Sequence, residues 1–340
     1  MNPTFILDAS KGEAEKPGFY RFADNPQEEN PQRGYIVSAN HQPLPRSGVP
    51  VPGYYNLFDR AQRLDSVLGS DAHPWDTAAA QALQLDTGNG YAARILRELL
   101  PVLNEVVTDP KEKFYLEPLT KWDGSYTRDS VAATLFTQML YEMAHATMSE
   151  KVGDVQFKNL LHTRALDYAL PLLAADPTSP WWDDRSTPVK ETRAQTMKVV
   201  WTNTLAHLNT RLGTSLLEWP WGKTHTLTHA HPLGMQKPLD MLFNVGPFAV
   251  PGGRETPNNL SGDLGPAPWA VSYGPSTRRV IDFADASQAV GINPLGQSGV
   301  LFDKHYADQA ERFVEGFYVP QYLSEADVKT HTKSTLRLRP

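Results

Sequence analysis

A histidine-rich segment between residues 224 and 231 contains the side chains whose types most directly suggest chemistry. His225, His229 and His231 occur in it, and on a strand His229 and His231 would share a face on which two imidazoles could bind a divalent metal. The segment has no HExxH pattern, and Asp240 is the candidate carboxylate that would have to complete a ligand set. The sequence therefore favours a half-exposed strand whose imidazoles hydrogen-bond to the backbone, with a metal-dependent hydrolase as the weaker hypothesis.

Patterns for several other chemistries are missing from the sequence. It contains no GxxxxGK[ST] phosphate loop, no GxGxxG after a strand and no GxSxG nucleophile elbow. The cysteine count is 0, which excludes disulfides, thiolate zinc sites and a cysteine nucleophile. A net charge of −6 argues against nucleic acid or an anionic membrane as the main partner. No apolar run is long enough to cross a bilayer, and the first residues do not have the pattern of a signal peptide.

The elements that must position any site fall into three stretches of the chain. Residues 1–63 are rich in turn formers, and within them 34–37 predicts a strand that ends in the polar loop 38–43. Residues 64–215 have helical periodicity, and 216–340 return to strands and turns. Strand-rich ends around a helical middle predict an α+β fold with an inserted helical lobe.

Apolar spacing gives the individual elements. Val131, Leu135, Met139 and Met143 follow one another at four-residue steps, the clearest helical stripe, and their most probable role is core packing. The predicted helices cover 71–82, 91–107, 127–148, 160–173, 191–212, 305–313 and 324–330, and two further strands are predicted over 270–273 and 279–283.

Three groups of residues carry a resemblance to a known family. They are NPQRGYIVSAN at 30–40 with RAQRL at 60–64; WGKTH at 221–225 with HPL at 231–233; and GPSTR at 274–278, GQSG at 296–299 and HYADQ at 305–309. In this order, and together with Trp122-Asp123-Gly124, they resemble the β-subunit of the penicillin acylase family, which includes penicillin amidases and acyl-homoserine lactone acylases. The resemblance runs from about residue 20 to the C-terminus.

This resemblance implies part of an αββα sandwich of the N-terminal-nucleophile hydrolase type. Such an enzyme cleaves the amide bond of N-acyl compounds, here β-lactam antibiotics or acyl-homoserine lactones. A serine at the start of the mature β-chain attacks the carbonyl, and its own α-amino group, with a pKa near 8, takes the hydroxyl proton.

Two residues of this chain match catalytic positions of the family. Asn40 corresponds to the asparagine whose side-chain amide donates to the oxyanion, a role that suits a neutral donor. Arg63 corresponds to the supporting arginine, whose planar fork of donors would fix the asparagine and the surroundings of the nucleophile. Without the flanking pattern, a turn asparagine and a surface arginine would be the simpler interpretations.

The nucleophile has no counterpart in this sequence. The resemblance places it well upstream of Asn40, whereas Met1 is the first residue, so we expect the C-terminal part of a β-subunit that is inactive alone. The expected partners are the missing N-terminal β-segment, the α-chain and a small N-acyl amide substrate, without nucleic acid or membrane. The parent enzyme would be periplasmic. The alternative is a non-catalytic relative that keeps the scaffold for binding or assembly.

The calcium site of the family is not matched. Its downstream carboxylate would fall near residues 54–56, which are Tyr-Tyr-Asn. Because calcium prefers carboxylate oxygens, we expect no complete calcium site and no other cofactor in this chain.

Overall fold

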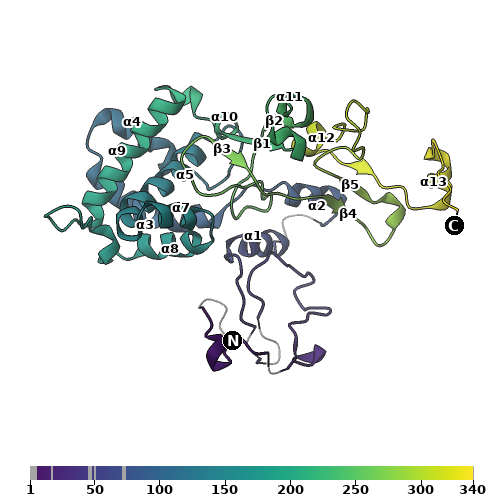
Figure 1. Ribbon diagram of the computed structural model, residues 1–340, viewed down its shortest axis with the longest axis horizontal. Helices are drawn as coiled ribbons and strands as arrows, with labels where there is room; N and C mark the ends of the chain where they lie inside the picture. The colour runs from purple at the N-terminus through teal and green to yellow at the C-terminus, as the bar shows by residue number, and fades with distance from the viewer. Residues whose placement is uncertain (1–5, 17, 45–47, 50, 71–73, 340) are drawn as a thin grey trace.

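The protein is described by a computed structural model that covers residues 6–16, 18–44, 48–49, 51–70 and 74–339. Helices fill one half of the molecule and two small sheets fill the other, while the segment before residue 59 extends away from the body (Figure 1). In chain order the helices before the first strand are α1 (Asp59–Leu68), α2 (Thr77–Gln84), α3 (Gly90–Val106), α4 (Pro110–Thr120), α5 (Val131–Ala144), α6 (Glu150–Val152), α7 (Asp154–Leu161), α8 (Ala165–Ala175), α9 (Arg193–Leu212) and α10 (Trp221–Thr224), and α2 among them lies against β4 (Arg278–Val280) of the sheet half.

Side-chain caps decide where the main helices begin. Asn89 Oδ1 accepts hydrogen bonds from the N–H groups of the first turn of α3, and Ser130 Oγ accepts one from Ala133 N at 3.1 Å in α5. Thr192 and Gln195 form a capping box at the start of α9. Such caps satisfy backbone N–H groups that have no partner inside the helix. The apolar stripes then bury against one another, with α9 packed on α3 and α5 and with α8 packed on α3.

The predicted helices exist, but several of their ends are wrong. The helix predicted over 127–148 begins after Ser130, because that residue is the cap, and it continues past α5 through a π-type turn at His145–Ser149. The prediction over 160–173 covers two helices, α7 and α8, which are separated by a turn at 162–164. α2 starts after its cap Asp76, and residues 71–73 of that prediction lie outside the described residues. The helix predicted over 305–313 is the shorter α12 (Ala310–Val314), and α4 was not predicted.

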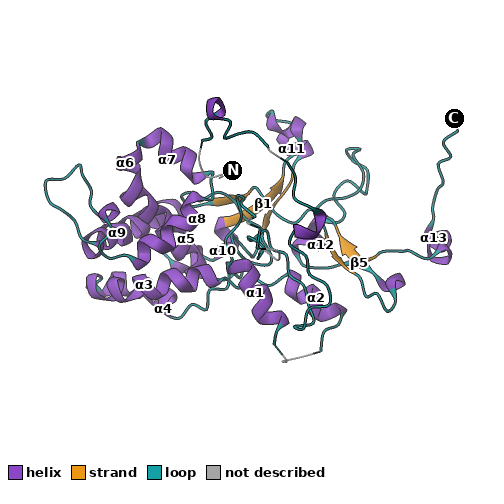
Figure 2. Cartoon of the chain, turned by 90° about the horizontal axis from the view of Figure 1, so that it is seen from below, coloured by secondary structure: helices purple, strands orange, loops and turns teal. Residues whose placement is uncertain are grey.

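Within the described residues the strands make two sheets of three strands each. The first has the order β2-β1-β3, in which β1 (His225–His229) runs antiparallel to β2 (Val245–Ala249) and parallel to β3 (Trp269–Val271). The second is antiparallel and has the order β4-β5-β6, from β4 (Arg278–Val280), β5 (Val290–Ile292) and β6 (Val319–Pro320). The short helices α11 (Asp240–Phe243) and α13 (Glu325–His331) complete this half. Figure 2 shows β1 beside the helical lobe and β5 farther from it.

The strand predicted over 34–37 is not formed. A strand persists only when its N–H and C=O groups pair with a neighbour, and Ile36 is 58% exposed in this segment. In the described part of 1–63, the sheet-like pairing that occurs is an isolated bridge between His41 and Asn56. The division of the chain at 63 and 215 stays a prediction.

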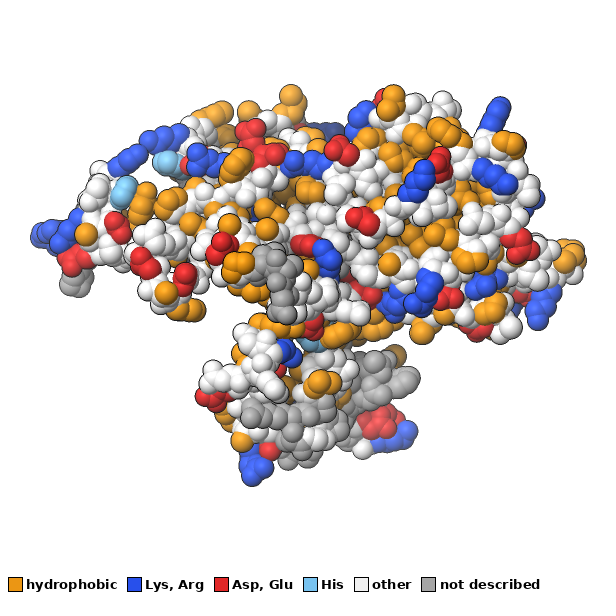
Figure 3. Space-filling view, turned by 180° about the vertical axis from the view of Figure 1, so that it is seen from behind, with side chains coloured by type: hydrophobic (Ala, Val, Ile, Leu, Met, Phe, Trp, Pro, Cys, Tyr) orange, Lys and Arg blue, Asp and Glu red, His pale blue; other side chains and the backbone are white. Residues whose placement is uncertain are grey.

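Large apolar side chains are exposed along the segment that precedes α1. They are Ile6, Phe19, Tyr20, Phe22, Ile36, Leu44, Tyr54 and Phe58. Figure 3 shows this segment as a projection from the rest of the molecule. No helix among the described residues is both long enough and apolar enough to cross a membrane.

Leu170 and Leu172 test the orientation of α8, because they are 1% and 70% exposed on the same helix. Leu170→Ala should lower the free energy of unfolding by about 2–5 kcal/mol, since it removes buried methylene groups and leaves a cavity. Leu172→Ala is the matched control, with an expected change within about 0.5 kcal/mol. Urea unfolding followed by circular dichroism measures both, and equal losses would contradict the packing of this helix.

Candidate active site

Asn40 lies at the tip of an exposed loop in a conformation that leaves its amide NH2 group available. Its φ of 60° is in the left-handed region, which asparagine tolerates better than most residues. Its Oδ1 accepts a short hydrogen bond from Arg60 Nη2, which also donates to Ala39 O at 2.7 Å. The backbone oxygen of Asn40 accepts from Asn56 N at 2.9 Å. The carbonyl end of this side chain is therefore fixed, and Nδ2 has no hydrogen-bond partner among the described residues.

The two arginines of α1 have different partners. Arg63 forms a double ion pair with Asp86, with Nε at 3.0 Å from Oδ1 and Nη2 at 2.6 Å from Oδ2. Asp86 Oδ1 also accepts from Gly88 N at 2.8 Å, so Arg63 holds the turn that leads into α3. The expectation that the fork of Arg63 fixes Asn40 is thus corrected, because Arg60 makes that contact and Asp86 occupies Arg63. A catalytic role for Asn40 or Arg63 stays a prediction.

A buried cluster of charged residues lies behind the Asn40 loop. Arg164 Nη1, at the start of α8, donates to Glu255 Oε1 at 2.9 Å and is 3.2 Å from Asp167 Oδ2. Arg254 Nη2 donates to the same Asp167 oxygen at 2.6 Å. Glu255 is only 3% exposed, and its Oε2 has no hydrogen-bond partner among the described residues. The cluster joins the helical lobe to the turn between β2 and β3.

The low polarity of the interior changes the acid–base behaviour of this cluster. Burial raises the pKa of Glu255 from 4.5 to about 7; Arg164 opposes this rise and Asp167 adds to it. Burial also raises the pKa of Asp59 and lowers the pKa of Arg60, and the charge of Glu255 partly offsets the effect on Arg60. The charges of Arg60 and Glu255 therefore influence each other, in the direction expected for attraction.

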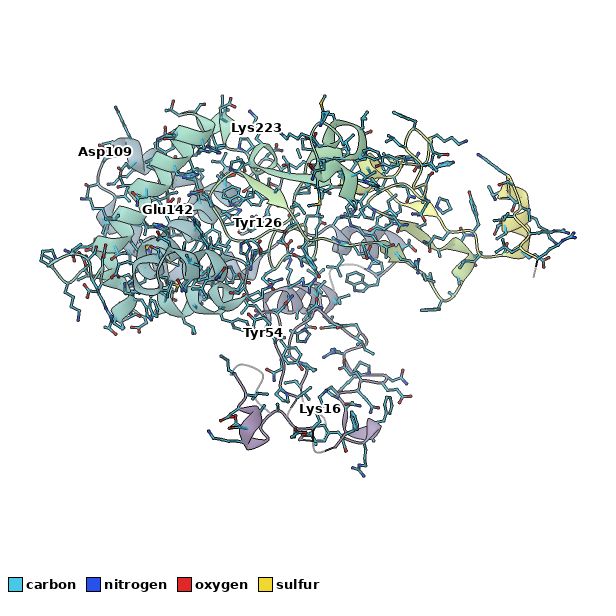
Figure 4. The ribbon with its side chains drawn as sticks, in the orientation of Figure 1. Lys16, Tyr54, Asp109, Tyr126, Glu142 and Lys223 are labelled. Atoms are coloured by element: carbon cyan, nitrogen blue, oxygen red, sulfur yellow. The ribbon has the colours of Figure 1, made fainter. Side chains whose placement is uncertain are left out.

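Two hollows border these charged groups. A small interior cavity of about 50 Å³ has both aromatic and ionic walls, among them Tyr126, Trp221, Asp167 and Glu255. Tyr126, labelled in Figure 4, lies where the helical lobe meets the sheets, and burial raises the pKa of its phenol. A more open pocket of about 310 Å³ lies next to Arg60. Its lining is mostly apolar and consists of Ser38, Ala39, Arg60, Leu64, Leu68, Trp75, Ala80, Leu83, Gln84 and Pro257.

The three histidines of the segment 224–231 do not form a metal site. His225 Nδ1 is 3.1 Å from Val250 O, and its ring stacks on Trp221 at a centroid distance of 4.4 Å. His231 Nδ1 accepts from Leu233 N at 3.1 Å. Within the described ranges, no group of three or more histidine, aspartate or glutamate residues could hold a metal ion. The backbone-bonded interpretation fits His225 and His231, and burial lowers the pKa of His225 to about 4.

Comparison with known proteins decides the family. The sequence model of the penicillin amidase family matches residues 1–330, almost the whole chain. This chain belongs to the penicillin amidase family. The acyl-homoserine lactone acylase QuiP of Pseudomonas aeruginosa is 26% identical over an alignment of 331 positions, which covers 87% of this chain and 38% of that protein. QuiP of Pseudomonas syringae pv. tomato is 26% identical over an alignment of 344 positions, which covers 94% of this chain and 41% of that protein. The chain thus spans well under half the length of these relatives.

A solved structure supports the same fold. The thermostable penicillin G acylase of Alcaligenes faecalis superposes with a TM-score of 0.59 at 18% sequence identity, covering 95% of this chain and 60% of that one. The predicted fold class, a mixed helix-and-sheet domain of the N-terminal-nucleophile hydrolase type, is confirmed, and so is the predicted family.

Several residues of the site were missed by sequence reasoning. Arg60 and Arg63 are three positions apart and so lie on one face of α1, which means that spacing alone could not say which one reaches Asn40. The sequence pattern predicts a helix around Arg164 and Asp167 and a turn around Glu255, and neither pattern indicates a charged cluster. The available signal was the charged pair Arg254-Glu255 directly after Gly252-Gly253, since two charged residues in a predicted turn suggest a specific role.

Arg60→Gln tests which arginine holds the loop. It removes two hydrogen bonds from a charged donor, each worth about 1.5–3 kcal/mol. Because the Asn56 amide donates to Asn40 O, loosening the loop should make that amide exchange its hydrogen about tenfold faster or more. Arg63→Gln is the control on the same helix and should leave that rate within about twofold. Amide hydrogen exchange by NMR or mass spectrometry gives the answer. Faster exchange in Arg63→Gln alone would restore the original assignment.

Glu255 should make stability depend on pH in a defined direction. Its pKa is higher in the folded chain, about 7 against 4.5, so the folded state binds more protons between these values. The contribution of this residue to the free energy of unfolding therefore decreases as pH rises from 4.5 to 7, by up to about 3 kcal/mol. Glu255→Gln mimics the protonated form, so its stability relative to the wild type should increase from pH 5 to pH 8. Urea unfolding at both pH values measures the difference, and a difference that does not change with pH contradicts the prediction.

Proposed function

We propose that this chain works as part of an acylase that hydrolyses the amide bond of N-acyl compounds. Acyl-homoserine lactones are the favoured substrates, because the curated relatives are named acyl-homoserine lactone acylases, and β-lactam antibiotics are the second class. The observation that carries the proposal is the state of Asn40, whose Oδ1 is held by Arg60 while its NH2 group is left to donate.

In the proposed reaction, Asn40 acts when negative charge develops on the carbonyl oxygen of the substrate. A serine attacks the acyl carbon, the carbonyl oxygen becomes an oxyanion, and Asn40 Nδ2 donates a hydrogen bond to it. The loop is preorganised by the bonds of Arg60 and Asn56, so no reorganisation is needed at that moment. The serine, its α-amino base and a backbone donor are assigned to the remainder of the acylase, and this chain alone is proposed to be inactive.

The proposed partners are therefore that remaining β-segment, an α-chain and the N-acyl substrate. The exposed apolar side chains before α1 support a surface that another part of the acylase covers. We propose a periplasmic location for the whole enzyme. The residues at 54–56 offer no carboxylate for the calcium ion of the family, so no step is assigned to calcium.

Asn40→Ala tests the proposal in an acylase assembled from this chain and a compatible serine-led segment of a relative. Removing one oxyanion donor should lower kcat about 10²–10³-fold with KM nearly unchanged, because the hydrogen bond strengthens only as charge develops. Turnover of a long-chain acyl-homoserine lactone and of a phenylacetyl amide, followed by amine release, provides both constants.

Asn203→Ala, at an exposed position of α9, is the matched control and should keep both constants. Full activity of Asn40→Ala would remove Asn40 from the mechanism. An assembled, correctly folded protein without turnover of any N-acyl amide would favour the non-catalytic scaffold instead.

A further inference from the structure

We propose that Glu255 is a positioning residue that orients Arg60 and, through Arg60, the side-chain amide of Asn40. The catalytic consequence rests on the proposed function, whereas the chain of contacts from Glu255 to Asn40 is a property of this chain alone. Glu255 does not touch the substrate in this scheme. It would set the direction of a guanidinium that already holds the Asn40 carbonyl oxygen.

Unsatisfied groups on both side chains support this link. Arg60 Nε is buried without a hydrogen-bond partner among the described residues, and so is Glu255 Oε2. The two groups carry opposite charge, and each shifts the pKa of the other in the direction expected for attraction. Pro257, two residues after Glu255, lines the same pocket as Arg60. A buried polar atom without a partner is costly. No direct ion pair joins Arg60 and Glu255 in the structure, so the two unsatisfied groups favour a contact bridged by water.

The backbone of Glu255 gives a second, independent reason. Its φ of 61° is in the left-handed region, which costs a non-glycine residue about 1–3 kcal/mol and persists where surrounding contacts impose it. The turn is held from inside, since Gly253 N donates to Thr256 Oγ1 at 3.1 Å and that hydroxyl donates to Asn258 O at 2.8 Å. A glycine would occupy this position without strain. The strained glutamate instead places a carboxylate against Arg164, with its second oxygen free of hydrogen bonds among the described residues.

In this proposal, the charge on Glu255 controls the orientation of the Arg60 side chain. The titratable or charged groups that interact with Glu255 are Arg60 and Asp59 from α1, Arg164 before α8, Asp167 and Tyr168 in α8, and Arg254 next to it in the turn. Arg164 is shared with Asp167, which also binds Arg254. When Glu255 is ionised, it attracts Arg60 and limits the directions that this side chain can take. When Glu255 is protonated, that attraction disappears and the Asn40 amide should become less well ordered.

The side-chain NH2 resonance of Asn40 provides a direct readout. In the 15N-labelled chain this resonance is identified by its loss in Asn40→Asp. In the wild type it should shift with a midpoint near pH 7, and in Glu255→Gln the shift should vanish. Glu105→Gln, at an exposed position of α3, should titrate as the wild type does. A pH-dependent shift that survives in Glu255→Gln would overturn the proposal.

Glu255→Asp covers the case in which Glu255→Gln does not fold. It keeps the charge but shortens the reach, so the Asn40 resonance should still titrate with a smaller amplitude. An unchanged amplitude would also overturn the proposal.

Activity separates this proposal from the proposed function. In the assembled acylase, Glu255→Gln should lower kcat about tenfold or more with KM within about twofold, because a misplaced donor weakens the transition state more than the substrate complex. Protonation of the α-amino base lowers kcat at acidic pH in both proteins, so the wild-type kcat should fall more steeply than that of Glu255→Gln as pH decreases through 7, and the ratio of the two should change with pH. Absence of turnover in the wild type would refute the proposed function, while the Asn40 resonance would still decide the role of Glu255.

Discussion

The pairing of two buried carboxylates with guanidinium groups is the interaction on which the rest of the structure depends. Taking a carboxylate out of water costs several kcal/mol unless a cation and hydrogen bonds replace the solvent. Asp167 forms ion pairs with both Arg164 and Arg254, and Glu255 forms one with Arg164. Because Asp167 belongs to α8 and Glu255 to the turn after β2, neither half of the molecule can move without leaving a charge unpaired.

Other contacts extend this junction in both directions. Asn89, the cap of α3, donates from Nδ2 to Arg254 O at 2.7 Å, so one side chain both starts a helix and binds the turn. Trp221 Nε1 donates to Gly252 O at 2.8 Å on the same turn. Arg128 extends to the end of α12, where it pairs with Glu315 at 2.9 Å. The turn 251–256 is therefore fixed from several elements, which explains how it can hold a strained glutamate.

The sequence predicts the parts of this structure that are local. The stripe from Val131 to Met143 gave α5, and a cap such as Ser130 could have given its first residue. The strand over 34–37 failed because pairing depends on a neighbour that local pattern does not reveal. The same limit applies to the site: Asn40 came from a motif, but the partner of Asn40 depends on how α1 lies against the loop. Glu255 gains its properties only from burial, which depends on three distant segments.

The placement of Arg60 has a consequence for the chemistry of an amide donor. A cation bound to the carbonyl oxygen of a carboxamide withdraws electron density, so the N–H groups at the other end become stronger donors. The Asn40 side chain itself stays neutral, so it does not bind anions tightly in the ground state. The positive charge of Arg60 nevertheless polarises the amide and makes its NH2 group a stronger donor. The burial of Arg60 strengthens this effect, because less water screens the guanidinium. In the proposed reaction, a neutral donor supported by a partly buried cation would favour an oxyanion that exists only briefly over a carbonyl group that is always present.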